Sequence, residues 1–349
     1  MLIMHMKQPA EATELTMRAI SCAEPGRLEL VNIEVPELAE GWVRVGISHV
    51  GICGTDYHIF EGTHPFLAYP RIIGHELSGR VIDPNGSSFS AGDPVVINPY
   101  LNCGHCEACR TGTPNCCETL RVLGVHTDGG MTEQIVVPAG NLYPAGDLSL
   151  RDAAMVEFLA IGAHAVRRTG IEAGERILVV GAGPIGLGTA LFARIAGGDV
   201  TILDAAPDKI AAAAELGFTA FGLADIAGDE FVQRRRTGFD AVLDATGSLR
   251  SMSASLLHAR SGGSLTLVGV TQGDLVWPDG EVHRREMTIR ASRNAVKSDF
   301  RHVMDSMLSG KIPTRALATH ATTLDRVVTD LPAWSHDRPG LIKAIVAVA

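Results

Sequence analysis

Two kinds of hydrophobic pattern divide the chain. From Met17 to about Gly146, apolar and polar residues alternate over short runs separated by glycine and proline, as in MRAISCAEPGRLELVNIEVPE and WVRVGISHVGIC. Alternation with a period of two predicts half-buried β-strands. Residues 1–16 show no such period. We therefore expect the fold to begin near Met17 and residues 1–16 to form a disordered extension.

The pattern changes near residue 151. The segment RDAAMVEFLAIGAHAVRR has apolar residues at helical spacing, which predicts one amphipathic helix over 151–168. The later runs ILVVGAG, VTILDA, AVLDATG and LTLVGV are almost wholly apolar, as is typical of parallel strands buried on both faces. Helical stretches such as PDKIAAAAELG separate them, which predicts βα units to about residue 295. Residues 299–349 return to mixed structure, with a helix at DFRHVMDSMLSGK and a last strand at LIKAIVAV.

Size and charge exclude several classes of function. A chain of 349 residues is long enough for two domains with a substantial core. Its net charge of -9 argues against broad attraction to the phosphates of nucleic acid. We find no apolar run of about 18 residues and no signal peptide. We therefore expect no nucleic-acid or membrane partner and a cytoplasmic location.

A glycine motif predicts a dinucleotide site. G-x-G-x-x-G follows an apolar strand and opens a predicted helix, where it allows a tight turn, close approach of backbone N–H groups to a pyrophosphate, and close helix packing. The next strand ends in Asp204, whose carboxylate can accept hydrogen bonds from the ribose of NAD and would repel the 2′-phosphate of NADP. The alternatives are a turn that binds nothing and a helix-capping role for Asp204. The predicted NAD site consists of Gly181, Gly183, Pro184, Ile185, Gly186 and Asp204.

Five of the seven cysteines lie between Cys103 and Cys117. In a cytoplasmic protein, such a density favours zinc over disulfides. Four thiolates complete a tetrahedral zinc shell and leave no open position, so this site is expected to be structural. Cys116 and Cys117 are equivalent on spacing alone, and His105 is expected on the surface. The predicted ligands are Cys103, Cys106, Cys109 and Cys117.

Further motifs carry a family resemblance. Five motifs follow one another along the chain: GICGTDYH at 51–58, GHE at 74–76, the cysteine loop, the glutamate of MVEFLA and the GAGPIGLG turn. In this they resemble the zinc-dependent medium-chain dehydrogenases, which include alcohol, threonine and polyol dehydrogenases. The resemblance implies an α/β fold with a GroES-like β domain and a Rossmann domain with a doubly wound parallel sheet. Residues 17–152 and 296–349 would form the first domain and residues 153–295 the NAD-binding domain.

The resemblance also implies a second, catalytic zinc in the cleft between the domains. Its expected ligands are Cys53, His75 and Glu157, with water or substrate in the fourth place and Glu76 nearby as an alternative ligand. Phe158 stands where proline is common in the family, which is a departure beside one ligand.

Three residues of the GICGTDYH segment have expected supporting roles. Thr55 and His58 would carry the substrate proton to solvent, because imidazole titrates near neutrality. Asp56 would orient His75. An ordinary surface histidine is the alternative for His58.

Longer phrases point to a substrate class. Four longer segments resemble the hexonate 5-dehydrogenases, which oxidise a hydroxyl of sugar acids such as L-galactonate and L-gulonate. These segments are HPFLAYPRIIGHELSG, TPNCCETLRVLGVHTDGG, FLAIGAHAVRR and ASRNAVKSDF. A substrate carboxylate needs cationic or polar partners. The alternatives are a neutral polyol dehydrogenase, a threonine-type dehydrogenase and a member without catalysis. The family also implies a homodimer or homotetramer. The candidate carboxylate partners are His64, His126, Arg293 and Asn294.

Overall fold

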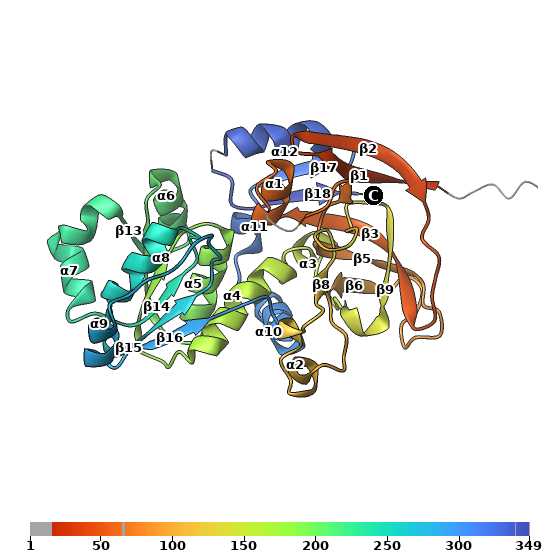
Figure 1. Ribbon diagram of the computed structural model, residues 1–349. Coiled ribbons are helices and arrows are strands. Elements are labelled where there is room, and N and C mark those ends of the chain that lie inside the picture. Colours follow the sequence, from red (N-terminus) through yellow and green to blue (C-terminus); the bar gives the residue numbers. More distant parts are fainter. Residues whose placement is uncertain (1–15, 65–66, 339, 349) are drawn as a thin grey trace, which may run out of the picture.

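The computed structural model of the protein describes residues 16–64, 67–338 and 340–348. Two regions, each built on its own sheet, lie side by side, with helices α4 (Val156–Thr169) and α10 (Lys297–Leu308) between them (Figure 1). Most of the expected extension, residues 1–15, lies outside the described residues. Thr16 already belongs to strand β1 (Thr16–Glu24).

The first region is organised around strand β3 (Trp42–Ile52), and its strand pairs are antiparallel except for the parallel pair of β17 and β18. This strand pairs with β5 (Glu76–Asp83), β9 (Gln134–Pro138) and the C-terminal strand β18 (Ala344–Ala347). The end of the chain therefore returns to the N-terminal sheet. The path β10-β6-β5-β3-β18-β17 is completed by β6 (Pro94–Ile97), β10 (Leu142–Pro144) and β17 (His320–Thr323).

Smaller sheets and short helices complete this region. The first small sheet has the order β2-β1-β4, with β2 at Arg27–Glu34 and β4 at Arg71–Ile72, and the second pairs β7 (Tyr100–Leu101) with β8 (Arg121–Val122). The helices here are α1 (Gly54–Phe60), α2 (Glu107–Arg110), α3 (Leu150–Ala153), α11 (Thr314–Leu317) and α12 (Val327–His336).

The second region is a parallel sheet of six strands in the order β13-β12-β11-β14-β15-β16. Numbered along the chain, this is the 3-2-1-4-5-6 order of doubly wound dinucleotide-binding sheets. The four buried strands expected from the sequence are confirmed as β11, β12, β14 and β15, and β13 and β16 are added at the edges. The strands are β11 (Arg176–Val180), β12 (Asp199–Asp204), β13 (Thr219–Gly222), β14 (Phe239–Asp244), β15 (Ala259–Leu267) and β16 (Thr288–Ala291). The helices are α5 (Pro184–Ile195), α6 (Pro207–Glu215), α7 (Asp229–Arg235), α8 (Leu249–Ser255) and α9 (Asp279–Arg284).

The helix expected over 151–168 is two helices, and this expectation was wrong. Helix α3 ends at Ala153 and α4 begins at Val156. The division follows from packing, because α3 contacts β5 and β6 whereas α4 contacts α5 and α10. At Gly162 the α4 backbone lies so close to α5 that an added Cβ would be 2.5 Å from the Thr189 nitrogen. Glycine at this position allows the two helices to pack closely.

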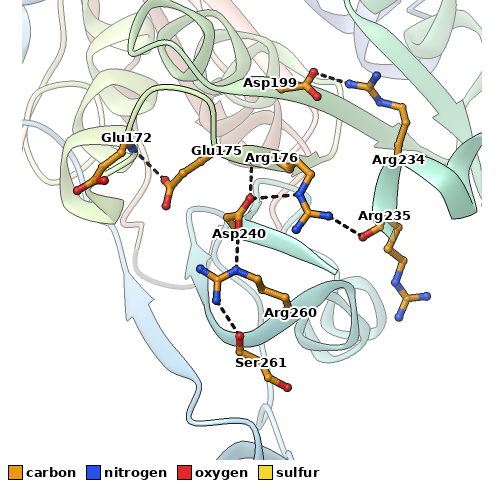
Figure 2. A network of polar contacts seen from close by, with 9 residues as sticks. All are labelled: Glu172, Glu175, Arg176, Asp199, Arg234, Arg235, Asp240, Arg260 and Ser261. Atoms are coloured by element: carbon orange, nitrogen blue, oxygen red, sulfur yellow. Dashed lines mark hydrogen bonds and ion pairs between the residues drawn. The ribbon is translucent and has the colours of Figure 1, made fainter. Parts of the chain in front are cut away.

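Ion pairs fasten the amino ends of the parallel strands (Figure 2). Asp240 on β14 accepts hydrogen bonds from Arg176 on β11, at 3.3 Å, and from Arg260 on β15, at 2.6 Å. Burial alone would raise the pKa of Asp240, but these two guanidinium groups lower it. This network lies at the edge opposite the glycine motif, so its role is to hold the sheet. The expected domain boundaries at 152/153 and 295/296 stay a prediction.

Candidate active site

The strand register brings the first group of candidate metal ligands together. Cys53 follows β3, His75 precedes β5, and the pairing of Gly51 with Glu76 places both residues at the same end of the sheet. Ligand atoms of Cys53, His75 and Glu76 all lie within 4.8 Å of one another. A Cβ on Gly51 would be 2.1 Å from Glu76 Oε2. Glycine at position 51 therefore leaves the space in which the Glu76 carboxylate lies.

Asp56 positions two of these residues. Its fully buried carboxylate accepts hydrogen bonds from the backbone nitrogens of Cys53, at 2.8 Å, and Gly74, at 3.2 Å. Its Oδ1 also lies 3.8 Å from His75 Nδ1, which is too far for a hydrogen bond. Burial raises the pKa of Asp56, although the charge of His75 opposes the shift. The orienting role expected of Asp56 toward His75 stays a prediction.

Glu76 is paired with a buried lysine. Lys343 Nζ lies 2.6 Å and 2.8 Å from the two Glu76 oxygens and donates to the Ile52 carbonyl at 3.0 Å. The relative exposures of the two side chains are 1% and 0%. Burial would lower the pKa of Lys343, but Glu76 and Cys53 raise it above its ordinary value. Glu76 is therefore a buried, charge-compensated carboxylate beside Cys53.

Glu157 lies at the same centre but outside the closest group. It is buried on α4 and accepts a hydrogen bond from the Tyr100 hydroxyl. Burial raises its pKa to about 7, although His75 and Tyr100 act in the opposite direction. Burial would lower the pKa of His75, but Cys53 and Asp56 raise it, and the charge of Glu157 adds to this rise. The ligand role of Glu157 stays a prediction. Glu76 is also a candidate third ligand, because its carboxylate lies within 4.8 Å of the ligand atoms of Cys53 and His75.

The second group of candidate ligands is the four-cysteine loop. The sulfurs of four cysteines lie within 4.8 Å of one another, and Cys103 Sγ is 4.0 Å from Cys109 Sγ. Thiolates bound at about 2.3 Å in a zinc tetrahedron are about 3.8 Å apart, so the set fits zinc. The Cys103 N–H lowers the pKa of Cys117 to about 6, which favours a thiolate. Cys116 and His105 are exposed, so Cys117 is the fourth member. The group is Cys103, Cys106, Cys109 and Cys117.

The two expected members of the proton path occupy different environments. Thr55 Oγ1 lies 3.7 Å from Cys53 Sγ, beside the candidate metal ligands. His58, one turn further along α1, is 62% exposed and contacts Thr63 Oγ1 at 3.2 Å through Nδ1. One residue therefore lies at the metal group and the other at solvent, while their joint function stays a prediction.

The glycine motif has the expected local geometry. Gly181 has a φ of +97°, and a Cβ on Gly186 would be 1.7 Å from the Gly181 carbonyl oxygen. An added Cβ on Gly183, which precedes Pro184 and Ile185 at the start of α5, would meet nothing within 4 Å. Space for a phosphate group thus remains at this helix end. Asp204, at the end of β12, accepts from Ala182 N at 2.6 Å and from Ala206 N at 2.8 Å.

The candidate carboxylate partners form two neighbouring pairs. Burial lowers the pKa of His64, and the charges of His126, His58 and His75 lower it further. Burial also lowers the pKa of His126, and the charge of Arg293 lowers it further. His64 is thus within electrostatic reach of His75, and His126 is within reach of Arg293, which is exposed. Asn294 has a φ of +51°, and its buried Nδ2 has no hydrogen-bond partner among the described residues.

A cavity of about 560 Å³ lies beside this segment, at the carboxyl ends of β15 and β16. Such folds bind ligands at this carboxyl edge of the sheet, where the strand order reverses between β11 and β14, and the cavity lies further along the same edge. Arg293 thus borders both the cavity and His126. The lining includes Met252, Leu267, Gly269, Val270, Ser292 and Arg293.

Sequence reasoning missed three residues around these sites. Lys343 left a weak signal as the single charge in LIKAIVAV. Tyr100 and Asn115 left none, because nothing local distinguishes a tyrosine or asparagine that forms a buried contact from one that does not. Tyr100 binds Glu157, and Asn115 binds the backbone of Arg293.

Comparisons with known proteins identify the family. A model described as alcohol dehydrogenase GroES-like domain matches residues 39–147, and one described as zinc-binding dehydrogenase matches residues 184–309. The L-galactonate-5-dehydrogenase of Escherichia coli K12 is 39% identical over 315 residues, which are 87% of this chain and 91% of that protein. The chain belongs to the zinc-dependent alcohol dehydrogenase family. The expected α/β fold, a GroES-like domain with a Rossmann-like domain, is thereby confirmed.

Two further proteins are similar to this dehydrogenase. The D-altritol 5-dehydrogenase of Agrobacterium fabrum C58 is 34% identical over 315 residues, with coverage of 85% of this chain and 93% of that protein. The crystal structure of an alcohol dehydrogenase from E. coli CFT073, complexed with NADH, has a TM-score of 0.89 and 28% identity, and the match covers 95% and 99% of the two chains.

The family defines the reaction class. This dehydrogenase is a zinc-dependent, NAD(P)-dependent enzyme that acts on CH–OH groups. Among the helices of the described residues, none is both long and apolar enough to cross a bilayer.

Proposed function

We propose that this dehydrogenase oxidises a secondary hydroxyl of a sugar acid, at C5 of a substrate like L-galactonate or L-gulonate, to a keto acid with NAD. The observation that carries the proposal is the electrostatic link from His75 to His64, from His64 to His126, and from His126 to Arg293, which borders the cavity at the carboxyl ends of β15 and β16. A carboxylate placed there would meet cationic and hydrogen-bonding partners while the hydroxyl faces the metal ligands. The similarity to an L-galactonate-5-dehydrogenase supports the same substrate class.

The residues present fit one zinc ion in each of two sites. Cys53 and His75, with Glu157 or Glu76, would hold the catalytic ion and leave one position for the substrate, whereas the four cysteines would hold a structural ion. When bound, the catalytic zinc supplies a Lewis acid that makes the substrate hydroxyl more acidic. The buried Lys343 neutralises Glu76 and limits the excess of negative charge around this position.

Residues of the chain would move the proton and orient the cofactor. We assign Thr55 Oγ1, beside Cys53, to accept a hydrogen bond from the substrate hydroxyl, and His58 to pass the proton to solvent. Backbone N–H groups at Gly183 and the start of α5 would face the pyrophosphate of NAD. Asp204 lies where it can accept from the ribose hydroxyls and repel the additional phosphate of NADP, so we assign NAD as the preferred cofactor.

A neutral polyol is the second candidate substrate class. The similarity to a D-altritol 5-dehydrogenase favours it, because a polyol needs no carboxylate partner. A threonine-type substrate is the third candidate. The two main candidates differ in one respect that kinetics can measure, since only a sugar acid would require the positive charge of Arg293.

The decisive experiment compares the rates of NAD reduction with L-gulonate, L-galactonate, D-sorbitol, xylitol and L-threonine. We expect the highest kcat/KM with a hexonate. Higher values with the neutral polyols would contradict the sugar-acid proposal. Arg293→Gln should raise the KM for hexonates and leave that for polyols unchanged.

Three broader expectations accompany this function as proposals. The GroES-like domain would comprise residues 17–152 and 296–349, with residues 153–295 binding NAD. We also propose a cytoplasmic location, as expected from the sequence, and a homodimer or homotetramer, as the family resemblance implies. Sedimentation would measure the oligomeric state directly.

A further inference from the structure

A chain of buried polar groups joins the cysteine loop to the segment that carries Arg293. Asn115, 5% exposed and placed between Cys109 and Cys117, donates from Nδ2 to the Arg293 carbonyl at 2.8 Å. The same Nδ2 lies 3.3 Å from His164 Nε2 on α4. His164 Nδ1 lies 2.7 Å from Asp299 Oδ2 on α10. Three regions far apart in the sequence, at residues 115, 164 and 293–299, thus share one hydrogen-bonded chain.

The direction of these bonds is fixed by chemistry. A carbonyl oxygen only accepts, so the atom of Asn115 that faces Arg293 must be the amide nitrogen. Its second hydrogen then points to His164 Nε2, which must be an acceptor. His164 therefore carries a proton on Nδ1 and donates it to Asp299, which is acceptor-only when ionised. Arg167 Nη2 lies 3.0 Å from the same Nδ1, but it can only donate, and its acceptor is then Asp299 Oδ2 at 3.2 Å. Each of these polar atoms has a partner, as buried groups require.

The chain holds the segment after β16 at both ends. Asn115 fixes the carbonyl of Arg293, and Asp299 accepts from the Val296 nitrogen at 2.9 Å at the start of α10. Arg167 binds the same carboxylate at 2.7 Å and anchors it to α4. Between the two fixed points lies Asn294, with its left-handed φ of +51°. The backbone from which the Arg293 side chain projects is therefore held in one conformation.

We propose that Asn115 is a positioning residue for substrate specificity, because it fixes the backbone of Arg293 and so holds the guanidinium where a substrate carboxylate binds. This inference rests on the proposed sugar-acid function for the role of Arg293, but the tether itself does not depend on the substrate. In this arrangement the four-cysteine loop contributes to specificity through Asn115, in addition to its structural role.

Two variants of Asn115 test the proposal in the complete, zinc-loaded enzyme. Asn115→Ala removes the tether, and the isosteric Asn115→Asp keeps the volume while a carboxylate oxygen cannot donate to the Arg293 carbonyl. Loss of one such hydrogen bond is expected to raise the KM for the preferred hexonate roughly fivefold, with kcat within about twofold of wild type. The KM for a neutral polyol should not change. In an Arg293→Ala background, the effect of Asn115→Ala on the hexonate KM should disappear.

Asn85→Ala is a matched control. Asn85 also donates from Nδ2 to two backbone carbonyls, those of Ala39 and Trp42, but it lies in an exposed hairpin turn of the first region. Its loss should lower the melting temperature without changing either KM. A purely structural role of Asn115 would give the same result as this control.

Hydrogen exchange of a peptide covering residues 291–296 tests the tether from Asn115 separately from the binding of a substrate carboxylate at Arg293. Faster exchange in Asn115→Ala, together with the raised hexonate KM, supports it. Unchanged exchange contradicts the tether, whatever the substrate. Faster exchange with no change in the hexonate KM contradicts the placement of the carboxylate at Arg293, and with it the proposed substrate class.

Discussion

The buried pair of Lys343 and Glu76 allows a quantitative prediction for Lys343→Met. The substitution keeps an unbranched apolar stem but leaves Glu76, which is 0% exposed, without its counter-charge. At 2.6 Å, and with an effective dielectric constant of about 20, the attraction that is lost is about 6 kcal/mol. Part of it is offset because the lysine no longer has to be desolvated. We expect the free energy of unfolding to fall by about 3–5 kcal/mol.

The assay is denaturant unfolding of the enzyme with and without a zinc chelator. The cost should be largest in chelated protein, because a bound zinc ion supplies positive charge near Glu76. Adding Glu76→Gln to Lys343→Met should restore more than half of the loss, since neither charge is then buried. Arg284→Met, which breaks an exposed pair with Glu281 at 2.9 Å, serves as control and should cost less than about 1 kcal/mol. A similarly small cost for Lys343→Met, or no recovery in the double variant, would refute the reasoning.

Three further changes have defined outcomes. Asp299→Asn should cost about 2 kcal/mol at pH 7, because the partners of this carboxylate hold its pKa at about 2, below the ordinary 3.8. That contribution is present above about pH 4 and is lost as the pH falls toward 2, so an equal cost at pH 7 and pH 2 would speak against it. Gly162→Ala should lower the free energy of unfolding by about 1–3 kcal/mol, because its Cβ would be 2.5 Å from the Thr189 nitrogen. Gly140→Ala is the control, since its Cβ would have no atom within 4 Å, and equal melting temperatures of the two variants would contradict the close packing. Asp204→Ser should reduce the preference for NAD over NADP, measured as the ratio of kcat/KM values, by about tenfold, equivalent to roughly 1.4 kcal/mol; an unchanged ratio would show that another group discriminates.

The sequence predicted the features that depend on local pattern. The strands β11, β12, β14 and β15 were expected because continuous apolar runs report burial on both faces. The close spacing of the first three cysteines predicted one zinc site, and the glycine motif predicted the turn at which the cofactor binds. The edge strands β13 and β16 were not singled out, and β16 is largely exposed, so it gives no continuous apolar run.

Contacts between distant segments could not be predicted in the same way. The pairing of Lys343 with Glu76 spans 267 positions, and that of Asn115 with the Arg293 carbonyl spans 178. Both depend on how β18 joins β3 and how the helices pack, which no local period encodes. The closest set around Cys53 contains Glu76 because β3 and β5 pair in one particular register. The position of Glu157 depends instead on where α4 begins.

The central claim is that the centre at Cys53 drives the oxidation whereas the four-cysteine loop supports the structure. The most direct measurement compares Cys53→Ala with Cys106→Ala for zinc content, melting temperature and NAD reduction with a hexonate. We predict that Cys53→Ala keeps the wild-type melting temperature and one zinc ion per chain but forms no NADH, whereas Cys106→Ala loses the other ion and melts at a lower temperature. Turnover by Cys53→Ala, or equal damage to folding in both variants, would contradict the account.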